Sequence, residues 1–137
     1  MVAQYAYFDE VNVLASDADW GWPSALRDIF RPRGVNLLVA RSASEFVNII
    51  EQKRIHTAII DMDTERSNGL TTIKIIRLSH PLVPCLLLKS QGNEDLLEKA
   101  LKLDVFSVID KPVDMGLLLA QLNRIFLKKY SSDLFAD

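Results

Sequence analysis

Charged side chains follow four of the short apolar runs in this sequence. They are Asp17 and Asp19 after the first run, Asp61 and Asp63 after the third, Lys89 after the fourth, and Asp110 and Lys111 after the fifth. Clustered carboxylates suit a hard cation such as Mg²⁺, and a lysine beside them can neutralise a phosphoryl group. An aspartate in such a setting could become an acyl phosphate. One polar residue after a strand can simply begin a turn, so the hypothesis depends on the joint arrangement.

The apolar runs alternate with segments of helical periodicity. We expect strands at residues 11–16, 35–39, 57–60, 85–88 and 106–109, and helices at 23–30, 42–50, 70–79, 93–103 and from about 113 to 126. This alternation predicts an α/β fold: a doubly wound, five-stranded parallel sheet with helices on both faces, in a three-layer sandwich. Ligands of such folds lie at the carboxyl ends of the strands, where the charged side chains would converge.

Length and composition favour a single globular domain. The chain has 137 residues, of which 49% are hydrophobic and 25% charged, so a mainly disordered chain is excluded. We expect an N-terminal extension at residues 1–10, a domain at 11–128 and a C-terminal tail or linker at 129–137. The net charge of −2 disfavours direct nucleic-acid binding. One cysteine, no secretion signal and no apolar stretch of membrane-spanning length predict a cytoplasmic protein without membrane contact.

Other common sites find little support in the sequence. Neither a Gly-rich dinucleotide loop nor a nucleoside-triphosphate loop occurs. His56 and His80 have no cysteine or second histidine at metal-ligand spacing, so a zinc site is not expected and both are interpreted as surface residues.

The third strand and its loop carry a family resemblance. The segment 57–70 places Asp61 at a strand end and Gly69 eight residues later, and Lys111-Pro112 follows the fifth strand. With Asp17 after the first strand, these positions resemble the receiver domain of two-component response regulators over residues 10–128. The resemblance implies that Asp61 accepts a phosphoryl group, that Lys111 stabilises the transferred charge, and that the peptide bond before Pro112 is cis.

The resemblance also implies a cofactor and partners. Mg²⁺ would be held by Asp17, Asp61 and the backbone carbonyl of Asp63, with Asp19 as a candidate substitute ligand. The phosphoryl group would come from a histidine kinase or another phosphodonor. The output would be altered contacts with a downstream protein or an output domain, through the fourth and fifth helices and the fifth strand. The same face could form a homodimer.

Three positions depart from the family pattern. Ala18 replaces an acidic residue, which weakens the expected metal site, and Val108 replaces the aromatic switch residue. Lys89 stands where the family has a hydroxyl residue, twenty-two positions before Lys111. Its ammonium could pair with Asp61 and hold one conformation permanently, or it could point to solvent from a loosened strand end.

The sequence therefore leaves two main functions open. The first is a receiver that is phosphorylated on Asp61, with Asp63 and Gln91 placed to make the phosphoryl group short-lived. The second is a phosphorylation-independent pseudo-receiver that serves as a protein-interaction module. A weaker third hypothesis is a phosphatase of the haloacid-dehalogenase type, because residues 61–64 resemble its opening motif. That motif should lie on an early strand of a longer chain, so we expect no enzyme.

Overall fold

The computed structural model describes residues 10–16, 23–62, 69–92 and 94–136. Its five strands form one parallel sheet in the order β2-β1-β3-β4-β5. The strands are β1 (Val11–Ser16), β2 (Val35–Ala40), β3 (Thr57–Asp61), β4 (Cys85–Lys89) and β5 (Ser107–Asp110). Every expected strand is present, with ends within one residue of the expectation, because uniformly apolar runs of this length are typical of strands covered on both faces.

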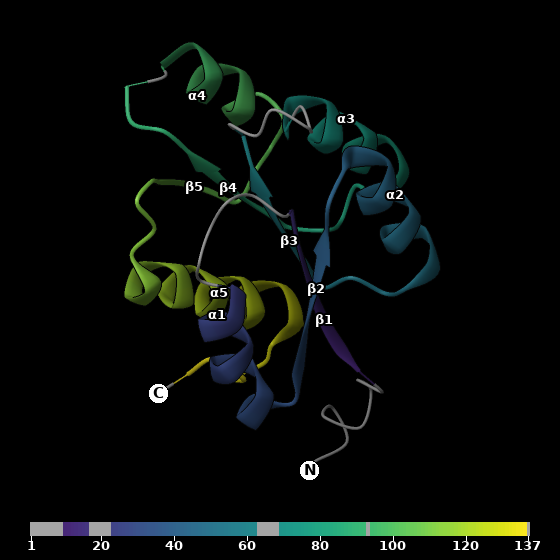
Figure 1. The fold of residues 1–137 in the computed structure, drawn as a ribbon, viewed down its shortest axis with the longest axis vertical. Helices are drawn as coiled ribbons and strands as arrows, with labels where there is room; N and C mark the ends of the chain where they lie inside the picture. Colours follow the sequence, from purple (N-terminus) through teal and green to yellow (C-terminus); the bar gives the residue numbers. More distant parts are fainter. Residues whose placement is uncertain (1–9, 17–22, 63–68, 93, 137) are drawn as a thin grey trace.

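Helices cover both faces of the sheet. They are α1 (Pro23–Phe30), α2 (Ala43–Gln52), α3 (Gly69–Ser79), α4 (Glu94–Leu101) and α5 (Met115–Tyr130), and a short 3-10 turn, η2 (Arg31–Arg33), follows α1. Figure 1 shows α1 and α5 on one side of the sheet and α2, α3 and α4 on the other. The doubly wound three-layer sandwich is confirmed.

Alternate residues of the strands supply two cores. Val13, Ala15 and Ile59 belong to the core under α1 and α5, whereas Leu14 and Ile60 belong to the core under α2 and α3. This alternation follows from the two-residue period of a strand, which turns successive side chains to opposite faces. The same alternation determines the face of the sheet on which a polar side chain at the end of a strand lies.

Two helices begin at side-chain caps that orient them on the sheet. Ser42 accepts a hydrogen bond from the backbone N–H of Glu45 at 3.1 Å, which confirms the expected start of α2. The Glu45 carboxylate accepts from the N–H of Arg41 at 3.4 Å, one residue before the position of an ideal capping box. Asp114 caps α5 by accepting from the N–H of Leu117 at 3.1 Å.

The C-terminal residues differ from the expected tail. α5 continues to Tyr130, two residues beyond the expected domain end, and the chain then folds back so that Phe135 is only 4% exposed. The Phe135 ring packs edge-on against Phe30 and Phe126, with centroids 5.3 and 4.9 Å away. Arg33 donates to the carbonyl of Leu134 at 3.1 Å. Residues 132–135 therefore pack against the ends of α1 and α5 and belong to the same core.

No helix in the described part of the chain has the length and apolar character that a membrane span requires.

Candidate functional site

Asp61 is the last residue of β3, and the neighbouring strand β1 fixes its backbone. Its side chain is 3% exposed, and its backbone N–H donates to the Ser16 hydroxyl at 2.7 Å. The next N–H, of Met62, donates to the carbonyl of Leu88 at 2.8 Å. Sequence reasoning missed Ser16, although its position as the last residue of β1, beside the end of β3, was an available signal. Bonds to both neighbouring strands therefore hold the Asp61 backbone in place.

Gly69 explains why a glycine follows Asp61 after eight residues. It is the first residue of α3 and is buried against the end of β3. A Cβ atom at Gly69 would lie 2.9 Å from Met62 Cα, 2.8 Å from Met62 Sδ and 3.0 Å from the Asp61 carbonyl oxygen. The first two distances are shorter than real Cβ contacts, so only glycine lets α3 begin this close to the strand end.

Lys111 directly follows β5, and its side chain reaches Asp61 at the end of β3. Its ammonium lies 2.5 Å from Asp61 Oδ1, and its side chain is 29% exposed. The Lys111 backbone N–H donates to the Lys89 carbonyl at 2.8 Å, and the following peptide bond to Pro112 is cis, as expected from the resemblance. The structure therefore brings together two of the expected site residues, which are fifty positions apart in the sequence.

Lys89 does not pair with Asp61 as hypothesised. Its ammonium lies 2.7 Å from Asp110 Oδ1 and donates to the Ser90 carbonyl at 3.3 Å. The Lys89 side chain is only 6% exposed, so the alternative of a lysine pointing to solvent is also wrong. Asp110, whose partner the sequence did not predict, is 54% exposed, so the negatively charged member of this ion pair lies at the surface.

The register of the sheet gives the physical reason for this pairing. Asp61 is level with Leu88, and Lys89 is level with Asp110. Leu88 belongs to the core under α1 and α5, whereas Leu87, and with it the alternate position Lys89, belongs to the other face. Asp61 and Lys89 therefore leave the sheet toward opposite faces, while Lys89 and Asp110 leave toward the same face.

The expected magnesium ligands lie mostly outside the described residues. Asp17, Asp19 and Asp63 are all in the undescribed segments, and so is Ala18. Within the described ranges, no group of three or more His, Cys, Asp or Glu side chains is placed to hold a metal ion. Asp61 is thus the one proposed carboxylate ligand that the structure describes. Gln91, the other residue expected to affect phosphoryl lifetime, donates to the Lys111 carbonyl at 3.3 Å.

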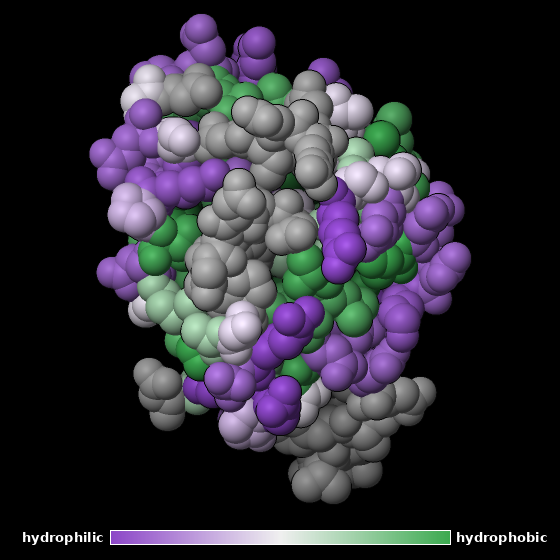
Figure 2. All heavy atoms as spheres, viewed as in Figure 1, coloured by the Kyte–Doolittle hydropathy of each residue, from purple (hydrophilic) through white to green (hydrophobic). Residues whose placement is uncertain are grey.

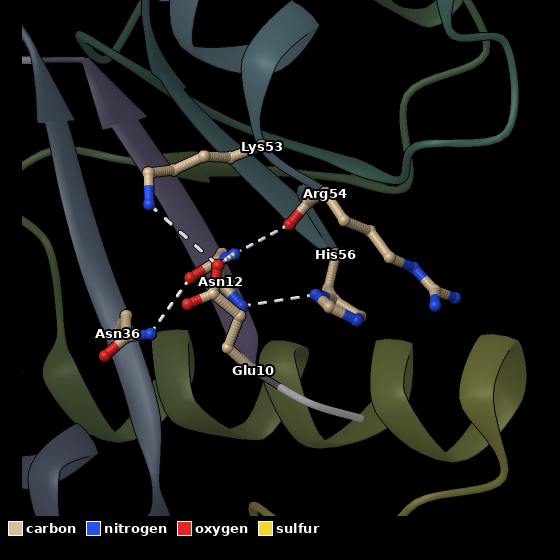
Figure 3. A network of polar contacts seen from close by, with 6 residues as sticks. All are labelled: Glu10, Asn12, Asn36, Lys53, Arg54 and His56. Carbon is tan, nitrogen blue, oxygen red and sulfur yellow. Dashed lines mark hydrogen bonds and ion pairs between the residues drawn. The ribbon is translucent and has the colours of Figure 1, made fainter. Parts of the chain in front are cut away.

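The amino end of β1 holds a second polar group, built around His56 (Figure 3). His56 was expected on the surface, but it is fully buried. Its Nδ1 accepts from the backbone N–H of Asn12 at 3.2 Å, and the Asn12 amide donates to the Arg54 carbonyl at 2.9 Å and to Glu10 at 3.3 Å. Burial, and then the charge of Arg54, lower the pKa of His56 to about 4. A neutral imidazole therefore accepts this backbone bond at neutral pH.

Comparison with known proteins identifies the family. The model of the response regulator receiver domain matches residues 13–123. Transcriptional regulatory protein ZraR of Escherichia coli K12 is 23% identical over 91% of this chain, and CpxR of the same strain is 24% identical over 89%. The chain spans 28% of ZraR and 52% of CpxR, so it corresponds to about a quarter to a half of these relatives.

Solved structures agree with this match. A response regulator receiver protein from Pseudomonas putida is 27% identical, has a TM-score of 0.75, and covers 84% of this chain and 97% of its own. The signal receiver domain of an HD domain-containing protein from Pseudomonas fluorescens Pf-5 has the same fold at 20% identity, with a TM-score of 0.79 over 90% of this chain and 99% of its own. Since the family model covers 13–123 of 137 residues, the chain belongs to the response regulator receiver domains of two-component systems.

Proposed function

We propose that this receiver domain accepts a phosphoryl group on Asp61. The observation that supports the proposal is the ion pair between Asp61 and Lys111 at the carboxyl ends of β3 and β5. A carboxylate held at a strand end beside an ammonium group has the nucleophile and the charge-stabilising group that acyl-phosphate formation needs.

The transfer is a displacement at phosphorus. An Asp61 carboxylate oxygen attacks and forms the new O–P bond, while the bond to the donor's leaving group breaks and that group departs with the electron pair. Lys111 is placed to neutralise negative charge on the transferred oxygens. Receiver domains generally bind Mg²⁺ for phosphorylation, and here Asp17, Asp61 and the Asp63 carbonyl would hold it, with Asp19 as a substitute. Mg²⁺ would supply further neutralisation of the phosphoryl charge.

The partners follow from the family. Receiver domains interact with histidine kinases and output domains. For this chain, we propose a histidine kinase or other phosphodonor on the input side, and a downstream protein or attached output domain on the other. We propose that the complete protein acts in the cytoplasm. A homodimer through α4, β5 and α5 remains part of the proposal. The receiver family is regulatory, which favours this function over the phosphatase hypothesis.

A specific observation also favours the pseudo-receiver as second candidate. Lys89 occupies the position of the family's hydroxyl residue, and its buried ammonium is held by Asp110 rather than available to a phosphoryl oxygen. Together with Val108 at the aromatic switch position, this pair would lock the strand ends in one arrangement. In that case, the domain would bind its partners without phosphorylation.

Intact-mass analysis after incubation with acetyl phosphate and Mg²⁺ distinguishes the two candidates. The first predicts a phosphoryl adduct on the wild-type chain that is absent from Asp61→Asn. The second predicts no adduct on the wild-type chain and a gain of one in Lys89→Thr. Asp114→Asn is the matched control, because it changes a carboxylate outside the site, and it should behave as the wild type. An adduct that persists in Asp61→Asn would overturn the proposed acceptor.

If an adduct forms, its lifetime tests a finer expectation. We expect the adduct on the wild type to decay faster than the adduct on Gln91→Leu, because the substitution removes the amide that would orient a hydrolytic water. Equal decay of the two proteins would exclude this role for Gln91.

A further inference from the structure

A cavity of about 500 Å³ lies against the edge strand β2, at the end of the sheet opposite Asp61. Consecutive β2 residues from Val35 to Leu38 form one wall. Arg27 and Arg31, from α1 and η2, line one side, and Lys53, which follows α2, lines the other. Figure 2 shows hydrophobic residues between the regions of α1 and α2, with strongly hydrophilic residues around them. We call this cavity the β2 groove.

The β2 groove is cationic. Three of the residues that line it carry positive charge, and none of the described lining residues is acidic. Arg27 and Arg31 are exposed, and neither guanidinium forms an ion pair with a carboxylate in the described part of the chain. Lys53 lies 3.9 Å from Glu10 with both side chains about half exposed, a weak pair that a competing anion can replace. The groove therefore favours an acidic ligand.

The backbone of β2 favours an extended ligand. Among the described residues, β2 pairs with β1 on one side only, and the outer side of an edge strand presents N–H and C=O groups to which another strand can bind. Val35 and Leu37 point to the α1 and α5 face, and Leu38 to the α2 face. A strand added along β2 continues this alternation, so its successive side chains would point toward the two arginines and toward Lys53 in turn.

We propose that the β2 groove binds an acidic peptide segment of a partner protein as an additional strand. Backbone hydrogen bonds to β2 would supply affinity, while carboxylates would reach Arg27 and Arg31 on one face and Lys53 on the other. A second copy of this chain is disfavoured because self-pairing would bring the same cations together. The inference goes beyond phosphoryl transfer and does not depend on Asp61.

Fluorescence anisotropy with a labelled peptide, acetyl-Val-Glu-Glu-Glu-Glu-Val-amide, tests the proposal. A matched peptide carries N-methyl groups on all four glutamate amides, which keeps every charge but removes hydrogen-bond donors from both edges of the extended peptide. We expect the unmethylated peptide to bind at least about tenfold more tightly. The double variant Arg27→Gln/Arg31→Gln should weaken its binding about tenfold, whereas the control Lys74→Gln/Lys128→Gln, with equal charge loss at exposed sites elsewhere, should stay within about twofold.

Three further readouts make the test specific. Bound peptide should slow amide hydrogen exchange in residues 35–38, and Asp61→Asn should bind the peptide as the wild type does. Inorganic phosphate should compete only through its ionic strength. No saturable binding up to about 1 mM peptide, equal affinity for the methylated peptide, or equal weakening in the control variant would each overturn the proposal. Competition by phosphate beyond matched chloride would identify a small-anion site instead.

Discussion

At the carboxyl ends of β3, β4 and β5 the buried polar groups are charged, whereas at the amino end of β1 they are mainly neutral. Asp61 and Lys89 each extend a buried charge toward a more exposed partner, Lys111 and Asp110 respectively. Asn12 and His56, by contrast, bind mainly backbone groups and the Asn36 amide, with the Glu10 carboxylate as a further partner of Asn12. In an ion pair with one exposed member, another ion of the same sign can replace the exposed partner at a small cost in free energy. Buried neutral hydrogen bonds cannot be exchanged in this way, because a lost partner is not replaced by water.

This difference separates function from stability within one sheet. Under the proposed function, the charged end would accept or release a phosphoryl group while the strands stay in place. The neutral end holds β1, β3 and α5 together: the Tyr130 hydroxyl donates to the His56 carbonyl at 2.5 Å, and the Phe126 ring stacks beside the imidazole, 6.4 Å between centroids. Substitutions should therefore affect the two ends differently, and the following experiments test that expectation.

The largest effect on stability is expected for Phe126→Ala. Phe126 is fully buried and contacts the rings of His56, Tyr130 and Phe135. Its loss leaves a cavity and should lower the free energy of unfolding by about 3–5 kcal/mol in urea denaturation. Leu127→Ala, at the adjacent and half-exposed position, should cost less than about 1 kcal/mol. Similar costs for the two variants would contradict the packing role given to α5.

The second prediction concerns pH. The pKa of His56 is about 4 in the folded protein, below its ordinary value of 6.5, so the unfolded chain binds this proton first. The contribution of His56 to the free energy of unfolding is therefore fully present above about pH 6.5. It decreases as the pH falls toward 4, by at most about 1.4 kcal/mol per pH unit.

His56→Gln is the matched variant, because its amide oxygen can still accept a hydrogen bond but does not titrate. Denaturation curves of both proteins between pH 7 and pH 4 separate the contribution of the histidine from that of the carboxylates, which the two proteins share. The wild type should lose more stability than His56→Gln over this range. Parallel losses in the two proteins would show that His56 becomes protonated in the folded state.

The third prediction is a cost of about 1 kcal/mol for Tyr130→Phe, which keeps the ring but removes the hydroxyl that binds the His56 carbonyl. Burial raises the pKa of Tyr130 to about 12, so the phenol remains a donor throughout the neutral range. Thermal or urea denaturation measures the cost, and phosphorylation by acetyl phosphate should be unchanged. A change in phosphorylation would mean that the two ends of the sheet are coupled.

The sequence was informative where one local pattern determined the outcome. Apolar runs predicted the strands, and polar residues after those runs predicted that Asp61 and Lys111 would meet, because parallel strands end at a common edge. The spacing between Asp61 and Gly69 is visible in the sequence, but its cause, the close approach of α3 to Met62, depends on the packing of α3 on the end of β3.

Contacts that depend on two distant segments were not predictable in the same way. His56 looked like a surface residue before a strand, but Asn12 and Tyr130 bury it from two other elements. Phe135 lies in a mostly polar end, and only its packing on Phe30 and Phe126 shows that this end belongs to the domain core. For Lys89, the sequence predicted the end of the strand, but identifying Asp110 as its partner requires the register between β4 and β5.

The smallest effect is expected for the ion pair of Lys89 and Asp110, and a double-mutant cycle measures it. The variants are Lys89→Met, Asp110→Asn and both together. Because Asp110 is half exposed, the coupling energy should be about 0.5 kcal/mol and should decrease with added salt. The single variants should differ: Asp110→Asn leaves a buried ammonium with one carbonyl partner, whereas Lys89→Met leaves an exposed carboxylate in water. Asp110→Asn should therefore cost more.

This asymmetry connects the pair to the choice between receiver and pseudo-receiver. If Lys89 is a locked replacement for the hydroxyl residue, Asp110→Asn removes the carboxylate that ties β4 to β5 at this point and should raise the yield of the adduct on Asp61. Lys89→Met should raise the yield as well, by removing the lock itself. If instead Lys89 already exchanges its partner during phosphorylation, Lys89→Met should lower the yield, because no cation replaces the lost ammonium. The direction of that single change separates a fixed pair from an exchangeable one.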